Sequence, residues 1–227
     1  MSRHLLYEIE KLKTRILALS DMVEQSVYQA VKSLQERDAD TAQAVIDTDT
    51  DIDLAEVDIE EECQKILALH QPVAHDLRFI IAVLKINTEL ERIGDASVNI
   101  AERVRLLAEE ERIGIPFDFL GMAEKAQTML RKSLDALIKL DARLALQVIN
   151  EDDEVDAINR DVYTLIEDSI QKNPEHVGSL IHLLGVSRHI ERIADHASNI
   201  AENVIYLIEG RIVRHHTEDF KRNNASS

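Results

Sequence analysis

The sequence predicts an all-α protein built from two pseudo-symmetric three-helix bundles in tandem, with six long helices in all. Three observations lead to this prediction. The 227 residues include only six Gly and three Pro, and aromatic residues make up 4%, so the chain lacks residues for the frequent turns of a sheet fold. Apolar side chains recur at three- and four-residue steps. The chain also repeats its own sequence at a fixed offset.

Helix-breaking and capping residues divide the chain into six helical segments. The first presents Leu5, Ile9 and Leu12 on one face and ends at the polar corner 37–40. Pro72 suits the first turn of the third segment, and Asn173-Pro174 opens the sixth. The predicted helices span about residues 5–37, 41–69, 72–111, 118–140, 142–171 and 173–213.

The internal repeat defines the domains. The sequence ERIGD at 91–95 recurs as ERIAD at 191–195, and NIAE at 99–102 recurs at 199–202. A weaker match at an offset of 103 relates Asp49 and Asp53 to Asp152 and Asp156. We therefore expect residues 1–113 to form the first bundle, residues 117–214 to form the second, and residues 215–227 to form a disordered tail. The break between the bundles is expected at Gly114-Ile115-Pro116.

The repeated segment places oxygen-bearing side chains within one arc of a helix. Like charges four residues apart cost a helix a few tenths of a kcal/mol, so this arrangement has no local benefit, yet it occurs twice in register. Carboxylate and amide oxygens are ligands for hard cations, and a solvated acidic face is the alternative. The predicted metal ligands are Glu91, Asp95, Asn99 and Glu102, their repeats Glu191, Asp195, Asn199 and Glu202, and Asp49, Asp53, Asp152 and Asp156 on the preceding helices.

Composition and missing motifs exclude several classes of function. A formal net charge of −17 argues against nucleic-acid binding, which draws on Lys and Arg. The single Cys63 permits no intrachain disulfide and no CxxC site. No histidine completes a Glu-x-x-His motif of a di-iron bundle, and no nucleotide-binding loop or nucleophile elbow is present. With no apolar run long enough to span a membrane, a cytoplasmic protein that is not an enzyme is expected.

The histidines of the sixth segment are expected to serve helix packing. His182, His189 and His196 recur every seven residues along its apolar stripe. Their Cα atoms would lie about 10 Å apart, which is too far for one metal site. Packing between helices is therefore the preferred interpretation.

These motifs together resemble the PhoU family of bacterial regulators of phosphate uptake. The most specific matches are QPVAHDLR at 71–78, LERIGD at 90–95 and IERIAD at 190–195. The family's metal-associated motif falls on Glu91 and Asp95 and is repeated at 191 and 195. The second copy has Ala194 in place of Gly94 and lacks a full counterpart of the Gln-Pro-Val-Ala run.

The resemblance implies a cytoplasmic negative regulator that couples the phosphate ABC transporter to the phosphate-sensing histidine kinase. It also implies bound iron, zinc, manganese or magnesium, a homodimer, and contact with the membrane only through partners. A helical-bundle metalloenzyme and a metal-independent scaffold are the alternatives. Because the sequence shows no evident phosphate cradle, we expect phosphate to be sensed by the partners.

Overall fold

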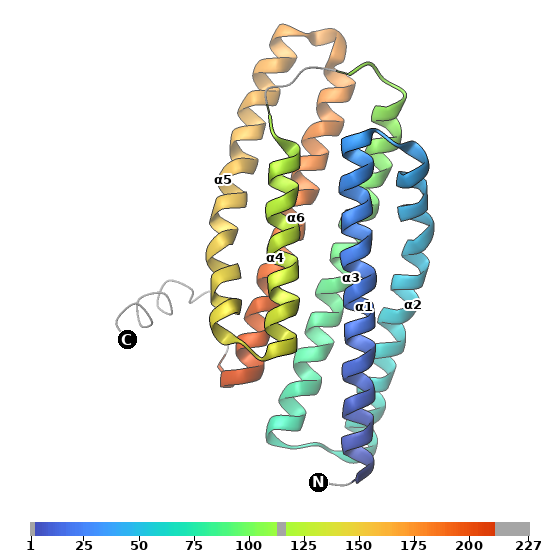
Figure 1. Cartoon of the computed structure of the whole chain (residues 1–227), viewed down its shortest axis with the longest axis vertical. Coiled ribbons are helices and arrows are strands. Elements are labelled where there is room, and N and C mark those ends of the chain that lie inside the picture. The colour runs from blue at the N-terminus through green and yellow to red at the C-terminus, as the bar shows by residue number, and fades with distance from the viewer. Residues whose placement is uncertain (1–2, 113–116, 212–227) are drawn as a thin grey trace, which may run out of the picture.

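The computed structural model describes residues 3–112 and 117–211 as a bundle of long helices (Figure 1). The predicted helix content is confirmed, and within these ranges there is no strand. The predicted junction at 114–116 and the predicted tail at 215–227 lie outside the described residues. The helices are α1 (Arg3–Glu36), α2 (Ala39–His70), α3 (Ala74–Ala108), α4 (Phe119–Lys139), α5 (Ala142–Lys172) and α6 (Val177–Glu209), and a 3₁₀ turn, η1 (Pro174–His176), precedes α6.

Equivalent capping residues begin the second helix of each half. Asp38 accepts hydrogen bonds from the backbone N–H groups of Asp40 and Thr41 at 3.0 and 3.2 Å. Asp141 accepts the equivalent bonds from Arg143 and Leu144 at 2.9 and 3.1 Å. Each cap satisfies backbone donors that a helix start leaves unpaired. The weaker sequence repeat therefore has a structural counterpart in α2 and α5.

Two predicted helix ends differ from the structure. Pro72 lies in the connection before α3, because Gln71 adopts a left-handed conformation (φ 45°) and donates its backbone N–H to Leu67 O, which closes α2. The sixth helix ends at Glu209 and not near Val213. Gly210 has a φ of 72°, a conformation that glycine adopts at little cost, and its N–H bonds Tyr206 O.

Helices α3 and α6 form the centre of the molecule and share its most extensive helix–helix contact. Figure 1 shows α1 and α2 on one side of this pair and α4 and α5 on the other. The two central helices run antiparallel, because Glu89 contacts His196, whereas Arg103, further along α3, lies against Gly185, earlier in α6. Each half thus contributes its third helix to the interface between the halves.

The core follows the apolar stripes that the sequence predicts. Ile93 and Ile100 of α3 are at most 1% exposed, as are Ile193 and Ile200 of α6. Burying a side chain of this size contributes roughly 1.5–3 kcal/mol. The small side chains between the acidic and apolar faces allow close approach, since a Cβ added at Gly94 would lie 3.3 Å from Ile52 Cγ2 of α2. No described helix is long and apolar enough to cross a membrane.

A buried carboxylate joins the two halves. Glu89 of α3 is 4% exposed, and its Oε2 lies 2.7 Å from Nδ1 of His196 and accepts a hydrogen bond from the Asn199 amide at 3.1 Å. Arg92 lies 3.7 Å from its other oxygen. Burial alone would raise the pKa of Glu89, but the bonds from His196 and Asn199 and the charge of Arg92 outweigh it and lower the pKa. The ionised carboxylate is therefore the form that links α3 to α6.

Replacing this carboxylate should weaken the contact between the halves. We expect Glu89→Ala to lower the free energy of unfolding by about 1–3 kcal/mol, because His196 and Asn199 lose a buried acceptor. Urea denaturation measures the change. Glu61→Ala, on the exposed side of α2, is the control and should stay within about 0.5 kcal/mol of the wild type. Equal effects of the two substitutions would contradict a stabilising role for the Glu89 contact.

Candidate metal centre

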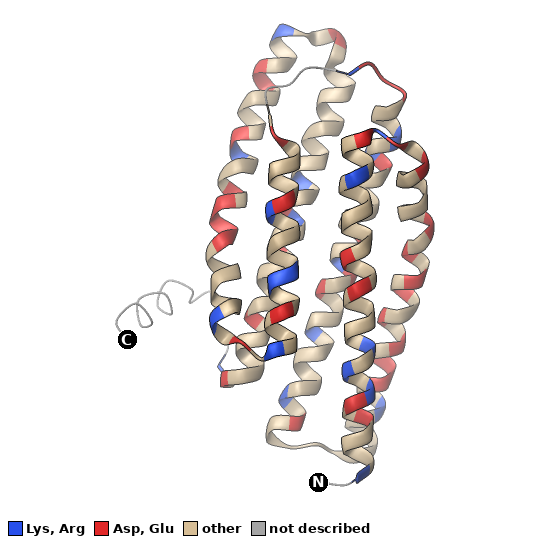
Figure 2. Ribbon diagram, in the orientation of Figure 1, with Lys and Arg blue, Asp and Glu red and all other residues tan. Residues whose placement is uncertain are grey.

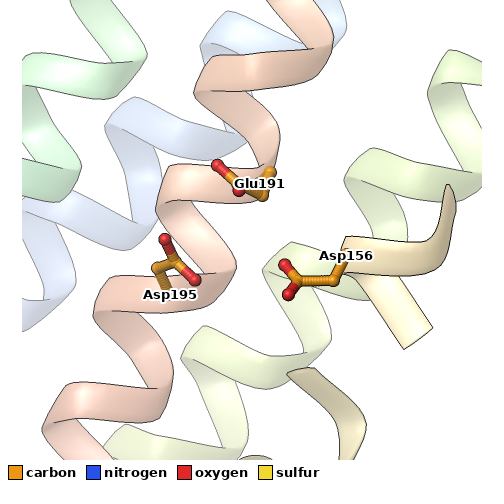
Figure 3. A group of neighbouring side chains, drawn as sticks. All are labelled: Asp156, Glu191 and Asp195. Atoms are coloured by element: carbon orange, nitrogen blue, oxygen red, sulfur yellow. The ribbon is translucent and has the colours of Figure 1, made fainter. Parts of the chain in front are cut away.

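The tightest acidic cluster lies between α5 and α6, where the second copy of the repeated motif is. Carboxylate oxygens of Asp156, Glu191 and Asp195 all lie within 4.8 Å of one another. Figure 3 shows Asp156 reaching from α5 toward the two acidic side chains of α6. All three are half-buried. Three carboxylate oxygens at this spacing can coordinate one cation together.

Asp152 adds a fourth carboxylate from one turn earlier in α5. Its Oδ1 atom is buried and has no hydrogen-bond partner among residues 3–112 and 117–211. Burial, followed by the charges of Asp195, Asp156, Asp153 and Glu191, raises the pKa of Asp152 to about 7. An unpaired buried oxygen is costly unless a proton or a cation compensates it. The chemistry of these donors therefore fits a metal ion.

The two acidic residues of α6 are affected in the same direction. Burial and the charges of Asp195 and Asp156 raise the pKa of Glu191. Burial and the charge of Asp156 raise the pKa of Asp195. Carboxyl groups that repel one another in this way gain stability when a cation lies between them.

The first half contains a looser version of the same cluster between α2 and α3. Burial and the charges of Asp53 and Asp95 raise the pKa of Asp49 to about 6. Burial raises the pKa of Glu91, and Asp95, Glu56 and Asp53 add to the shift. Within residues 3–112, no three carboxylates meet as closely as Asp156, Glu191 and Asp195 do. The acidic residues of α2 and α5 also appear as the red runs along the outer helices in Figure 2.

The four remaining predicted ligands are not members of the tight carboxylate group. Asn199 donates to Glu89 across the α3–α6 interface, and Asn99 donates to the backbone oxygen of Asp95 at 2.6 Å. Glu102 borders a surface groove with Asp40 and Gln43. Glu202 is half-buried and lies seven residues beyond Asp195. Metal coordination by these four residues stays a prediction.

Sequence reasoning missed Glu56 and its counterpart Asn159. Glu56 lies on the same face of α2 as Asp49 and Asp53, and its Oε1 accepts a hydrogen bond from Asn87 at 3.1 Å. Burial and the charges of Glu60 and Asp53 raise its pKa. Asn159 of α5 is 8% exposed, and its Oδ1 has no hydrogen-bond partner in the part of the chain that the structure describes. Extending the 103-residue match by three residues from Asp53 and Asp156 would have found both.

Comparisons with known proteins agree with this architecture. A family model for the PhoU domain matches residues 16–104 and 119–204. The phosphate-specific transport system accessory protein PhoU homolog of Aquifex aeolicus is 40% identical over 208 residues, which cover 92% of this chain and 94% of that protein.

Two crystal structures share the fold. PhoU from Pseudomonas aeruginosa superposes with a TM-score of 0.87 at 36% identity, over 90% of this chain and 99% of that one. The phosphate transport system regulatory protein PhoU from Streptococcus pneumoniae gives a TM-score of 0.82 at 28% identity, over 92% and 99% of the two chains. The fold and the acidic repeat define a helical bundle built from a tandem repeat. The chain belongs to the PhoU family and contains two PhoU domains in tandem.

Family membership confirms two predictions made from the sequence. The resemblance to PhoU proteins is correct. So is the expectation that the chain is not an enzyme, since the family comprises accessory and regulatory proteins and is not known for catalysis.

The raised pKa of Asp152 has a measurable effect on stability. Between about pH 4 and pH 7, folded Asp152 keeps a proton that the unfolded residue, with a pKa of about 3.9, has lost. The free energy of unfolding of metal-free protein should therefore fall as the pH rises through this range. A pKa raised from about 3.9 to about 7 corresponds to about 4 kcal/mol, and solvent screening at this half-buried position reduces that figure. Asp152→Asn removes this contribution, so the variant should gain on the order of 1–2 kcal/mol over the wild type from pH 4 to pH 8.

Urea denaturation in the presence of a chelator measures this difference. Asp168→Asn, which makes the same change at an exposed position of α5, is the control and should differ from the wild type by a constant amount. A gap between Asp152→Asn and the wild type that does not change with pH would contradict the raised pKa.

Proposed function

We propose that this protein is a cytoplasmic negative regulator of phosphate uptake and of the phosphate-starvation response. In this role it would couple the phosphate ABC transporter to the phosphate-sensing histidine kinase. The observation that supports the proposal most directly is family membership over both PhoU domains. The Aquifex aeolicus relative is named as an accessory protein of phosphate-specific transport, and the Streptococcus pneumoniae protein is described as a regulator of that system.

The regulation is proposed to act through protein contacts. The net charge of −17 disfavours nucleic acid as a partner, and contact with the membrane would come through the transporter and the kinase. Exposed apolar side chains on the α2–α3 corner support a protein interface there. Leu69 and Val73 are 68% and 74% exposed, and Leu77 of α3 is 38% exposed. A homodimer is part of the proposal.

We further propose that the acidic clusters hold metal ions. Asp156, Glu191, Asp195 and Asp152 would hold one ion between α5 and α6, and Asp49, Asp53, Glu91 and Asp95 would form the equivalent site between α2 and α3. A bound cation would neutralise carboxylates from two helices and fix these helices together. The donors are all oxygens, which favours magnesium, manganese or iron over zinc.

The regulatory proposal predicts the phenotype of a deletion strain. Loss of the protein should raise expression of phosphate-starvation genes in phosphate-rich medium, because the negative regulator is absent. Transcript measurement with and without phosphate checks this, and complementation with the wild-type gene is the control. Unchanged expression in phosphate-rich medium would count against the regulatory role.

The metal proposal predicts a loss of metal-dependent stability in one double variant. Glu191→Gln with Asp195→Asn removes two charged ligands from the tight cluster. A metal that binds only the folded state contributes RT ln(1 + [L]/Kd), about 2.7 kcal/mol at a hundredfold excess over Kd. We expect the wild type to gain melting temperature with manganese, iron or magnesium and the variant to gain much less.

Thermal melts with chelator and with each added metal separate this effect from a solvated acidic face. For a solvated face, neutralising the pair only relieves repulsion, so the variant would melt at the same temperature as the wild type or higher, and neither protein would respond to metal. Glu91→Gln with Asp95→Asn tests the first-half cluster in the same way. Metal analysis of protein purified without affinity resin distinguishes a metal-independent scaffold from a metal-binding regulator and from a metalloenzyme.

A further inference from the structure

The interface between α3 and α6 has two ends that the internal repeat relates to each other. At one end, the carboxylate of Glu89 accepts hydrogen bonds and pairs with Arg92. The 100-residue offset places His189 at the position equivalent to Glu89 and Arg103 at the position equivalent to Asn203. The second end therefore has the basic residues His189 and Arg103 at the positions where the first end has Glu89 and Asn203.

Arg103 lies in the middle of this second end. Its guanidinium packs against the backbone of α6 at Gly185, where an added Cβ would fall 2.3 Å from both Cζ and Nε of Arg103. His182 and His189 lie on the same face of α6, on either side of Gly185 along the helix axis. His189 is 8% exposed, and Arg103 and His182 are half-buried.

Three nitrogen atoms of basic side chains are unpaired at this end. Nε of Arg103, Nδ1 of His182 and Nδ1 of His189 are buried and form no hydrogen bond with any described part of the chain. Over residues 3–112 and 117–211, Arg103 also forms no ion pair. A buried hydrogen-bond donor without a partner is unfavourable. Nε–H of Arg103 is such a donor within the described residues, and each imidazole can donate from Nδ1 in one of its two tautomers.

The charged groups that affect His189 are positive, whereas nearer the start of α6 the carboxylate of Glu110 accepts a hydrogen bond from Ser179, one turn before His182. Burial, followed by the charges of Arg103, Arg192 and Arg188, lowers the pKa of His189 to about 4, and no carboxylate contributes to this shift. A neutral imidazole still donates one N–H. The nearby acidic cluster does not compensate Arg103, because its carboxylates meet on the side of α6 that faces α5 (Figure 3).

We propose that Arg103, His182 and His189 form a binding site for a small oxyanion between the two PhoU domains. The planar guanidinium offers paired N–H donors that match the oxygens of a phosphate-like ion, and the imidazoles add donors from α6. The burial of His189 restricts the site to a small free ion and excludes a phosphorylated group on another macromolecule. The ion contacts both halves at once and takes the role that the Glu89 carboxylate has at the other end.

This proposal differs from the expectation that phosphate is sensed only by the partners. It does not depend on the metal clusters or on the regulatory role, and its failure would leave both proposals unchanged. The fixed positive charge of the Arg103 guanidinium disfavours a cation as the ligand. An ordered water molecule could satisfy some of the donors but would not compensate the charge of Arg103.

The test uses the full chain with a chelator present, so that phosphate cannot bind through a metal. Isothermal titration with inorganic phosphate, and separately with sulfate, is compared at constant ionic strength with chloride. We expect saturable binding of phosphate by the wild type. Arg103→Ala should weaken the affinity about tenfold to a hundredfold, because a charged hydrogen-bond donor is lost.

Gly185→Ala is the second variant and removes no polar group. Its Cβ displaces the guanidinium, while alanine favours the helix relative to glycine. The variant should therefore stay folded, melt no lower than the wild type in chloride, and bind phosphate at least about tenfold more weakly. Arg105→Ala, at an exposed position of α3, is the matched control for net charge and should bind as the wild type does.

The outcomes decide the proposal. Saturable binding of phosphate or of sulfate that both Arg103→Ala and Gly185→Ala weaken supports an oxyanion site. The absence of saturable binding to the wild type overturns it. If Arg105→Ala weakens binding as much as Arg103→Ala does, the ion responds only to general surface charge, and the proposal is overturned. If Gly185→Ala leaves binding unchanged, the position of the Arg103 guanidinium at Gly185 does not matter, and the proposal is also overturned.

Discussion

The antiparallel packing of α3 against α6 is the constraint on which the rest of the structure depends. These helices are the third of each half, and each packs against the other two helices of its own half. Because both are enclosed on several sides, they contain most of the fully buried side chains, such as Ile93 and Ile200. The face that remains, next to α2 in one half and α5 in the other, is where the acidic residues collect.

The electrostatics of that face follow from the packing. Asp152 and Asp49 lie close enough to the central helices to lose water, and each then feels the carboxylates of the neighbouring helix. A free acidic surface would relax by turning its side chains outward. Here Gly94 in one half and Ala194 in the other keep the helices close together, so the repulsion persists until a proton or a cation compensates it. The small residues that allow the helices to pack closely therefore also hold the carboxylates near one another.

The sequence predicted the fold well because the signals of a helical repeat are local. Apolar periodicity, caps such as Asp38 and Asp141, and the repeated ERI motif each depend on residues within a few turns of one another. Three features were not accessible in this way. The left-handed Gln71 ends α2 although nothing in its residue type requires it. The contact between Glu89 and His196 joins residues 107 positions apart. The amide of Asn199 donates a hydrogen bond to Glu89. Helical periodicity placed Asn199 on the acidic face but does not determine which partner its side chain bonds.

The two halves differ where they meet because the interface places different demands on each copy of the repeat. Within each half, the repeat must preserve the apolar stripe and the acidic face, because each half has to pack its own three helices. The interface between the halves is shared by both copies, so a residue and its repeat take different partners there. Glu89 accepts hydrogen bonds from other residues of the chain, whereas its equivalent, His189, lies with Arg103 among nitrogen atoms that have no partner in the described part of the chain. A duplicated fold can therefore keep its architecture and change the chemistry of one end of its central interface, which is where a ligand that contacts both domains has the largest effect on how they are held together.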